Sequence, residues 1–178
     1  MRVISGKARG TSLFSLEGSH TRPTTDRVKE AMFSIINFYL YDALVLDLFA
    51  GSGALGIEAL SRGAKKCVFV ENSRVAADVV RKNLEKTCLL ESSELKLCDF
   101  KDYLNFAKES FDVILLDPPY NKKLCDEALD IMYRKNLLND EGIIVCETEF
   151  EEVVSTCFIK KKDYKYGKIK LSVYTKGD

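Results

Sequence analysis

The stretch that most constrains the fold runs from Leu44 to Gly56. It joins a short apolar run, a loop with the pattern G-x-G-x-x-G that starts at Gly51, and the beginning of an amphipathic helix. Glycines let a backbone turn tightly and approach a ligand, and a helix N-terminus offers free N–H groups. The stretch therefore predicts the strand–loop–helix opening of a nucleotide-binding α/β unit, but the glycine pattern alone does not choose the cofactor.

The remaining periodicity predicts a doubly wound α/β domain. A helix after residue 25 is expected to turn Val28, Met32, Ile35 or Ile36, and Tyr39 towards the core. Strands are expected near 43–48, 66–71, 95–98, 111–116 and 142–147, and helices near 54–62, 74–87, 101–108 and 124–134. Residues 153–166 and 168–174 are expected to add two further strands, which gives a seven-stranded, mostly parallel sheet with an antiparallel last strand.

Composition narrows the class of protein. The six cysteines are scattered without a C-x-x-C pair and the chain has one histidine, so we expect reduced structural thiols and no metal site. No apolar run is long enough to cross a bilayer, and residues 1–6 do not resemble a signal peptide. We therefore expect a cytoplasmic protein without a membrane partner.

Charge is uneven although the formal net charge is zero. Residues 1–41 carry six basic and three acidic side chains, and residues 159–178 carry seven lysines and two aspartates. A glycine-flanked hairpin tip in residues 1–18 would present Lys7 and Arg9 as a phosphate clamp, with Arg22 nearby in the chain. The alternative is that these basic residues only keep the protein soluble.

A second motif, Asp117-Pro118-Pro119-Tyr120, follows the fourth expected strand. Ligands of open α/β sheets bind beyond the carboxyl ends of the strands, so this motif should lie beside the glycine loop. A carboxylate, fixed carbonyl groups and an aromatic ring suit a planar group that carries an exocyclic amine. A hydride-transferring enzyme needs none of these groups.

The two motifs together resemble those of the S-adenosylmethionine-dependent amino-methyltransferases. The segments 2–10, 21–30 and 47–63 resemble, more narrowly, the bacterial 16S ribosomal RNA guanine-N2 methyltransferase family. The resemblance extends over nearly the whole chain. It implies a Rossmann-like class I methyltransferase fold, with residues 1–20 as an N-terminal hairpin extension and 21–178 as the methyltransferase domain.

The resemblance also implies roles for individual residues. S-adenosylmethionine would be the cofactor, and its ligands would be Thr24, Thr25, Arg27, Asp47, Phe49, Gly51, Gly53, Glu71, Asn72, Asp99 and Phe100. The catalytic residues would be Asp117, Pro118, Pro119 and Tyr120, and the RNA-binding residues would be Lys7, Arg9 and Arg22. Phe100 stands where a small residue is expected. The implied partner is 16S ribosomal RNA, in an assembling small ribosomal subunit, and we expect a monomer.

Three other functions fit part of the pattern. Adenine-N6 DNA methyltransferases usually carry a separate recognition region, for which 178 residues leave little room. Glutamine-N5 protein methyltransferases typically begin the second motif with Asn instead of Asp117. A dinucleotide-binding oxidoreductase explains the glycine loop and Glu71, but leaves the second motif without a purpose.

Overall fold

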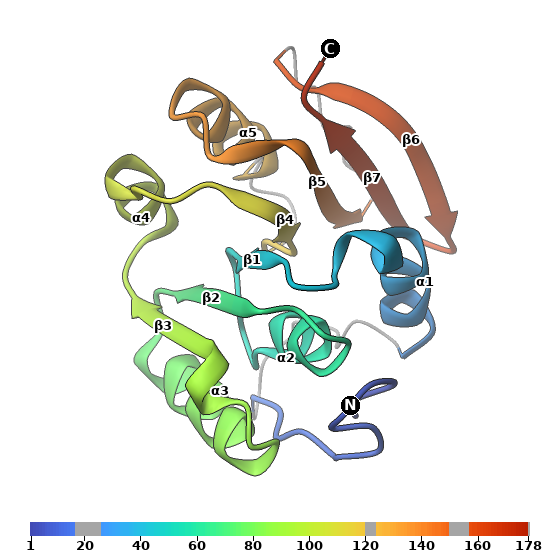
Figure 1. Ribbon diagram of the computed structural model, residues 1–178, viewed down its shortest axis with the longest axis vertical. Helices are drawn as coiled ribbons and strands as arrows, with labels where there is room; N and C mark the ends of the chain where they lie inside the picture. The colour runs from blue at the N-terminus through green and yellow to red at the C-terminus, as the bar shows by residue number, and fades with distance from the viewer. Residues whose placement is uncertain (17–25, 120–123, 150–156, 178) are drawn as a thin grey trace.

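A seven-stranded sheet with helices on both faces forms the body of the computed structural model (Figure 1). The structure describes residues 1–16, 26–119, 124–149 and 157–177. The strands are β1 (Leu44–Asp47), β2 (Lys66–Glu71), β3 (Ser93–Leu97), β4 (Phe111–Leu116), β5 (Leu138–Glu149), β6 (Ile159–Tyr166) and β7 (Ile169–Thr175). The α-helices are α1 (Asp26–Ile36), α2 (Ala54–Ser61), α3 (Arg74–Lys86), α4 (Phe100–Phe106) and α5 (Leu124–Arg134). Short 3-10 helices, η1 (Asn37–Tyr39) and η2 (Leu90–Ser92), follow α1 and precede β3.

The strand order is β3-β2-β1-β4-β5-β7-β6. The first five strands are parallel, and β7 is antiparallel to both β5 and β6. This confirms the predicted fold, including the reversed last strand. The order changes direction between β1 and β4, which is the position where open α/β sheets bind ligands.

Alternation along the strands divides the core into two layers, because successive side chains point to opposite faces. Val45 of β1 and Phe69 of β2 pack with α1, α2 and α3 on one face. Leu46 of β1 and Val68 of β2 pack with α4 and α5 on the other. Strands that are apolar on both faces are what a covered parallel sheet requires, and the sheet is covered on both sides.

Three details differ from the expectation. The strand expected over residues 153–166 begins at Ile159, and residues 153–156 lie outside the described part of the chain. The helical spacing predicts Tyr39 in the core, but Tyr39 is 40% exposed because α1 ends at Ile36 and the chain continues as η1. Strand β5 begins at Leu138 instead of near residue 142, and its pairing with β4 shifts register between Phe111 and Val113. The first residues of β5 include the polar run Asn139 to Glu141, so the apolar pattern of the sequence indicates a strand only after them.

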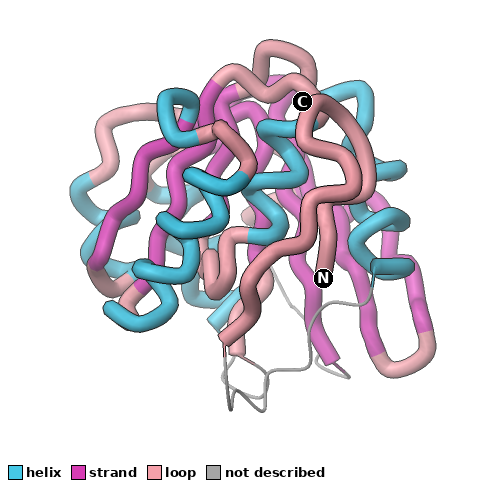
Figure 2. Tube along the Cα trace, turned by 90° about the horizontal axis from the view of Figure 1, so that it is seen from below, coloured by secondary structure: helices cyan, strands magenta, loops and turns pink. Residues whose placement is uncertain are grey.

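Residues 1–16 form an arm on the outside of the helical layer (Figure 2). A single antiparallel bridge between Arg2 and Ser12 replaces a regular hairpin ladder, and Val3, Ala8 and Leu13 are buried. No helix among the described residues is long and apolar enough to cross a membrane.

Candidate active site

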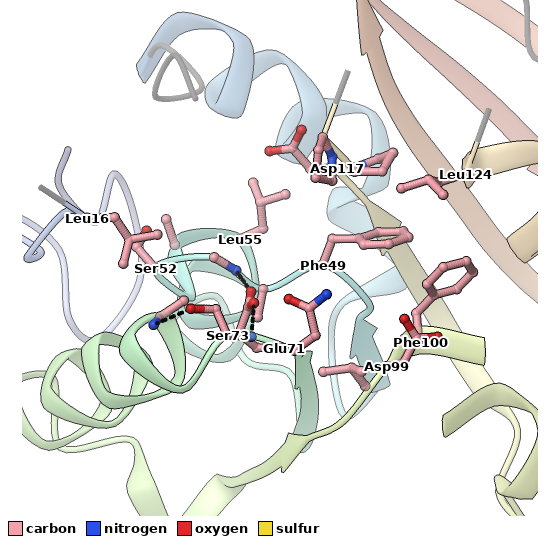
Figure 3. A pocket seen from close by; sticks show the side chains of 18 of the residues that line it. Leu16, Phe49, Ser52, Leu55, Glu71, Ser73, Asp99, Phe100, Asp117 and Leu124 are labelled. Carbon is pink, nitrogen blue, oxygen red and sulfur yellow. Dashed lines mark hydrogen bonds between the residues drawn. The ribbon is translucent and has the colours of Figure 1, made fainter. Parts of the chain in front are cut away.

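A cavity of about 680 Å³ lies at the carboxyl ends of β1, β2 and β4 (Figure 3). This volume is within the range of small-molecule and cofactor sites. Its wall includes nine of the predicted site residues: Phe49, Gly51, Glu71, Asn72, Asp99, Phe100, Asp117, Pro118 and Pro119. The fold therefore brings the two sequence motifs to one cavity, as their positions after β1 and β4 require.

The glycine loop fits a ligand that approaches its backbone closely. Gly51 has φ +54° and Gly53 has φ +79°, a region that residues with a Cβ rarely adopt. A Cβ on Gly51 would meet no atom within 4 Å, whereas a Cβ on Gly56 would come within 2.3 Å of the Phe69 ring. Gly51 thus leaves open space at the cavity wall, and Gly56 allows α2 to pack against the sheet.

Glu71, at the end of β2, is held rigidly at the cavity wall. Its Oε2 accepts a hydrogen bond from the Gly51 N–H at 2.8 Å, and its Oε1 accepts one from the Ser73 N–H at 2.8 Å (Figure 3). The side chain of Ser73 in turn caps α3 by accepting from the Ala76 N–H at 3.3 Å. The carboxylate is therefore fixed in direction and offers its remaining lone pairs to the hydroxyl groups of a ligand.

Asp47, the last residue of β1, lies beneath the cavity and not in its wall. Its Oδ2 accepts a hydrogen bond from the Gly56 N–H at 2.9 Å, which caps the first turn of α2. Its Oδ1 is buried, and no group in the described part of the chain donates to it. Burial, reinforced by the negative charges of Asp117 and Glu71 and opposed by the Gly56 hydrogen bond, raises the pKa of Asp47 to about 7.

Phe49 and Phe100 form an aromatic wall. Their ring centroids are 5.1 Å apart at an interplanar angle of 49°. Asp99 caps α4 through a 2.8 Å hydrogen bond that its Oδ1 accepts from the Lys101 N–H. A planar ligand can thus meet an apolar surface and a carboxylate in adjacent positions, and the large side chain of Phe100 is part of that surface.

Asp117 follows β4 directly and lies across the cavity from the glycine loop (Figure 3), and Pro118 is also part of the cavity wall. Asp117 is half-buried, Pro118 is buried and Pro119 is exposed. A half-buried carboxylate at the rim can accept hydrogen bonds from a group that enters the cavity from solvent. Tyr120 lies outside the described residues, as do Thr24, Thr25 and Arg22.

The N-terminal arm supplies wall residues that sequence reasoning missed: Met1, Ser15 and Leu16. Asn83 of α3 fixes the end of the arm, because it accepts from the Phe14 N–H at 2.7 Å and donates to the carbonyls of Phe14 at 3.0 Å and Ser52 at 2.9 Å. One buried amide therefore ties the arm to the glycine loop. A lone Asn in an amphipathic helix carries no sequence signal for such a role.

Glu58 of α2 fixes the middle of the arm. Its carboxylate accepts from the N–H groups of Ile4 at 2.8 Å and Ser5 at 3.0 Å. It also pairs with the fully buried Lys29 ammonium at 3.2 Å and with the Arg62 guanidinium at 2.8 Å. Burial lowers the pKa of Lys29, although the charge of Glu58 opposes this shift.

Lys7 and Arg9, which are predicted to hold phosphates, lie away from this cavity. The Lys7 N–H donates to the Ser61 carbonyl at 2.9 Å, which places the tip of the arm at the C-terminal end of α2. The cavity lies at the N-terminal end of α2, so Lys7 and Arg9 are exposed at the opposite end of that helix. Arg27, in the first turn of α1, is exposed and is not among the residues of the cavity wall.

Comparison with known proteins gives matches along nearly the full chain. The family model described as Conserved hypothetical protein 95 matches residues 1–175. A Bacillus subtilis protein, provisionally named rRNA methyltransferase YlbH, is 39% identical over 183 residues, covering 99% of each chain. Ribosomal RNA small subunit methyltransferase D of Haemophilus influenzae is 38% identical over 159 residues, covering 88% of this chain and 82% of that protein. A solved Escherichia coli chain, provisionally described as a methyltransferase, superposes with a TM-score of 0.87 at 31% identity, covering 99% of this chain and 97% of that one.

Proposed function

The chain belongs to the family described as Conserved hypothetical protein 95, and its relatives include a named small-subunit ribosomal RNA methyltransferase. We propose that it methylates the exocyclic N2 amine of a guanine in 16S ribosomal RNA. The methyl donor is S-adenosylmethionine. One observation carries the proposal: the glycine loop with Glu71 and the Asp117-Pro118 segment line the same cavity.

The residues of the cavity fit the cofactor. The open space at Gly51 admits the cofactor beside the loop backbone, and Glu71 faces the cavity with both oxygens fixed for the ribose hydroxyls. Phe49 and Phe100 provide the apolar surface that a purine ring requires, next to the carboxylate of Asp99. When bound, S-adenosylmethionine supplies a methyl group already activated by a positively charged sulfur.

Asp117 and Pro118 would orient the substrate amine. The guanine N2 lone pair is delocalised into the ring, so the amine is a weak nucleophile. A hydrogen bond from N2–H to the Asp117 carboxylate and another to the Pro118 carbonyl favour a geometry in which the lone pair points away from the ring plane. The Asp117 carboxylate also stabilises the positive charge that develops on nitrogen, and Tyr120 would stack on the base that has left its RNA stack.

The test is methyl transfer from labelled S-adenosylmethionine to three substrates in parallel: undermethylated small ribosomal subunits, free 16S RNA and duplex DNA. We expect label as N2-methylguanine in the particle or the free RNA, and the comparison identifies the substrate form. Label only in DNA would overturn the proposed substrate, and absence of both label and cofactor binding would overturn the proposed reaction class.

Asp117→Asn should lower turnover by about 10²- to 10³-fold, because a neutral amide does not stabilise the positive charge that develops on the nitrogen. The dissociation constant for S-adenosylmethionine, measured by calorimetry, should stay within about threefold of the wild-type value. Asp112→Asn is the matched control, since Asp112 lies near the other end of β4, where it accepts from the Leu44 N–H and does not line the cavity. Equal losses of turnover in both variants would contradict the role of Asp117.

A further inference from the structure

The turn between β6 and β7 lies at the same edge of the sheet as the candidate active site. Strand β7 is antiparallel to β5 and β6, and Ile169 pairs with Glu149 of β5 and with Tyr166 of β6. Since Glu149 ends β5, the turn stands at the carboxyl end of the parallel strands, where Asp117 follows β4. Three lysines surround this turn, and we call them the turn lysines: Lys165, Lys168 and Lys170.

Two of the turn lysines face each other, and no ion pair with a described residue offsets their positive charges. Lys165 is paired directly with Lys170 across the strands. No carboxylate oxygen of a described residue lies within 4.0 Å of either ammonium group. Like charges directly opposite each other destabilise a strand pair, so this arrangement is unfavourable unless an anion binds there.

Lys165 and Lys170 also share one face of the sheet. Their neighbours Tyr164 and Tyr166 pack against the core layer that contains α1, α2 and α3. Alternation then directs Lys165 and Lys170 to the other face, which α4 and α5 cover. Leu124, the first residue of α5, is part of the cavity wall on that side.

The lysine run at the start of β6 differs in its position along the sheet and in its interactions. Ile159 pairs with Thr175, which in turn pairs with Ile143, so the run Lys160 to Lys162 lies towards the opposite edge of the sheet. Lys160 forms an ion pair with Asp163 at 3.6 Å, and the Lys162 ammonium lies 4.9 Å from the centre of the Tyr164 ring. The two lysine groups of one hairpin are therefore not equivalent.

We propose that the turn lysines bind phosphates of the RNA strand that delivers the target base to the cavity. This inference rests on the proposed function, and it divides the basic C-terminal segment into a part that contacts RNA and a part that does not. The proposed contact lies at the carboxyl edge of the sheet, whereas Lys7 and Arg9 lie at the far end of α2, and their role in RNA binding stays a separate prediction.

The test compares two double variants of equal charge: Lys165→Ala with Lys170→Ala, and Lys161→Ala with Lys162→Ala. The dissociation constants for 16S RNA and for undermethylated small subunits are measured between about 50 and 200 mM salt, together with the midpoint of thermal unfolding. The first variant should bind RNA roughly tenfold more weakly, and its salt slope should fall by about 1.4 to 1.8 because two phosphate contacts are lost. Its unfolding midpoint should stay equal or rise, because the repulsion between Lys165 and Lys170 is removed.

The control variant should keep the wild-type RNA affinity and salt slope. Equal weakening in both variants would mean that only net charge matters, and no weakening in the first variant would remove the turn lysines from the interface. Either result leaves the proposed function intact if the wild-type protein still methylates RNA. Absence of wild-type binding to both RNA substrates would instead count against the proposed function itself.

Discussion

Glu58, within α2, and Asp47, which accepts from an N–H of α2, are both buried carboxylates, but their surroundings differ. Glu58 is surrounded by two backbone N–H groups, the Lys29 ammonium and the Arg62 guanidinium. Asp47 accepts one hydrogen bond, from the Gly56 N–H, and its second oxygen has no donor among the described residues. A buried carboxylate with all of its hydrogen-bond partners holds neighbouring segments in place. A buried carboxylate that lacks partners lowers the free energy of unfolding, and other interactions in the fold must offset this loss.

Removal of the Glu58 carboxylate should have the largest effect on stability. Glu58→Leu leaves the Lys29 ammonium buried without its carboxylate and the Ile4 and Ser5 N–H groups without acceptors. We expect a loss of about 3 to 5 kcal/mol in the free energy of unfolding, measured by urea denaturation. Addition of Lys29→Met should recover part of this loss, since it removes the unpaired charge; a double variant less stable than Glu58→Leu would contradict this account.

Asp47→Asn should change how stability depends on pH. The folded protein holds a proton on Asp47 up to about pH 7, whereas the unfolded chain releases it near the ordinary aspartate pKa of 3.8. The free energy of unfolding of the wild type should therefore fall as pH rises from about 4 to 7, by on the order of a few kcal/mol, and level off above the folded-state pKa.

The Asp47→Asn variant should lack this contribution, and the difference between the two unfolding curves at pH 5 and pH 8 measures it. Asn can still accept from the Gly56 N–H, so the cap of α2 is preserved. If wild type and variant differ by the same free energy of unfolding at both pH values, Asp47 does not take up a proton when the chain folds.

Glu71→Gln should have the smallest effect on stability of the three, and its effect should be on the cofactor. The amide would turn one N–H donor towards the N–H of Gly51 or Ser73, which disturbs the fixed direction of the side chain. We expect the dissociation constant for S-adenosylmethionine to rise by roughly tenfold, with less than about 1 kcal/mol lost from the free energy of unfolding. Unchanged affinity by calorimetry would remove Glu71 from the cofactor site.

The carboxylates of the protein also show which structural roles can be predicted from the sequence and which cannot. Glu71 and Asp117 follow strands with clear apolar patterns, so topology alone places them at one edge of the sheet. Glu58 looked like an ordinary acid on an amphipathic helix, because its partners Ile4, Ser5 and Lys29 are distant in the chain. Contacts between distant segments have no periodicity from which they can be predicted.

The N-terminal arm is the clearest example. Its turn and its basic tip were predicted from Gly6, Lys7 and Arg9, but its direction along α2 depends on Glu58 at the middle and Asn83 at the end. That direction turns the tip away from the cavity and brings Leu16 into the cavity wall. The strand count and the reversed β7 were predictable, since they depend on local alternation and on the turn at Gly167.

The position of β7 has a consequence for how the chain folds during synthesis. Strand β7 follows β6 in the chain but lies between β5 and β6 in the sheet, so β6 has no partner in the sheet until β7 has been made. Folding that proceeds from the N-terminus as the chain leaves the ribosome can complete β1 to β5, but the edge of β5 stays open until residues 169–175 emerge. The final step is then the insertion of one strand between two others, and a chain stalled before residue 169 would expose the apolar edge of β5 to other chains.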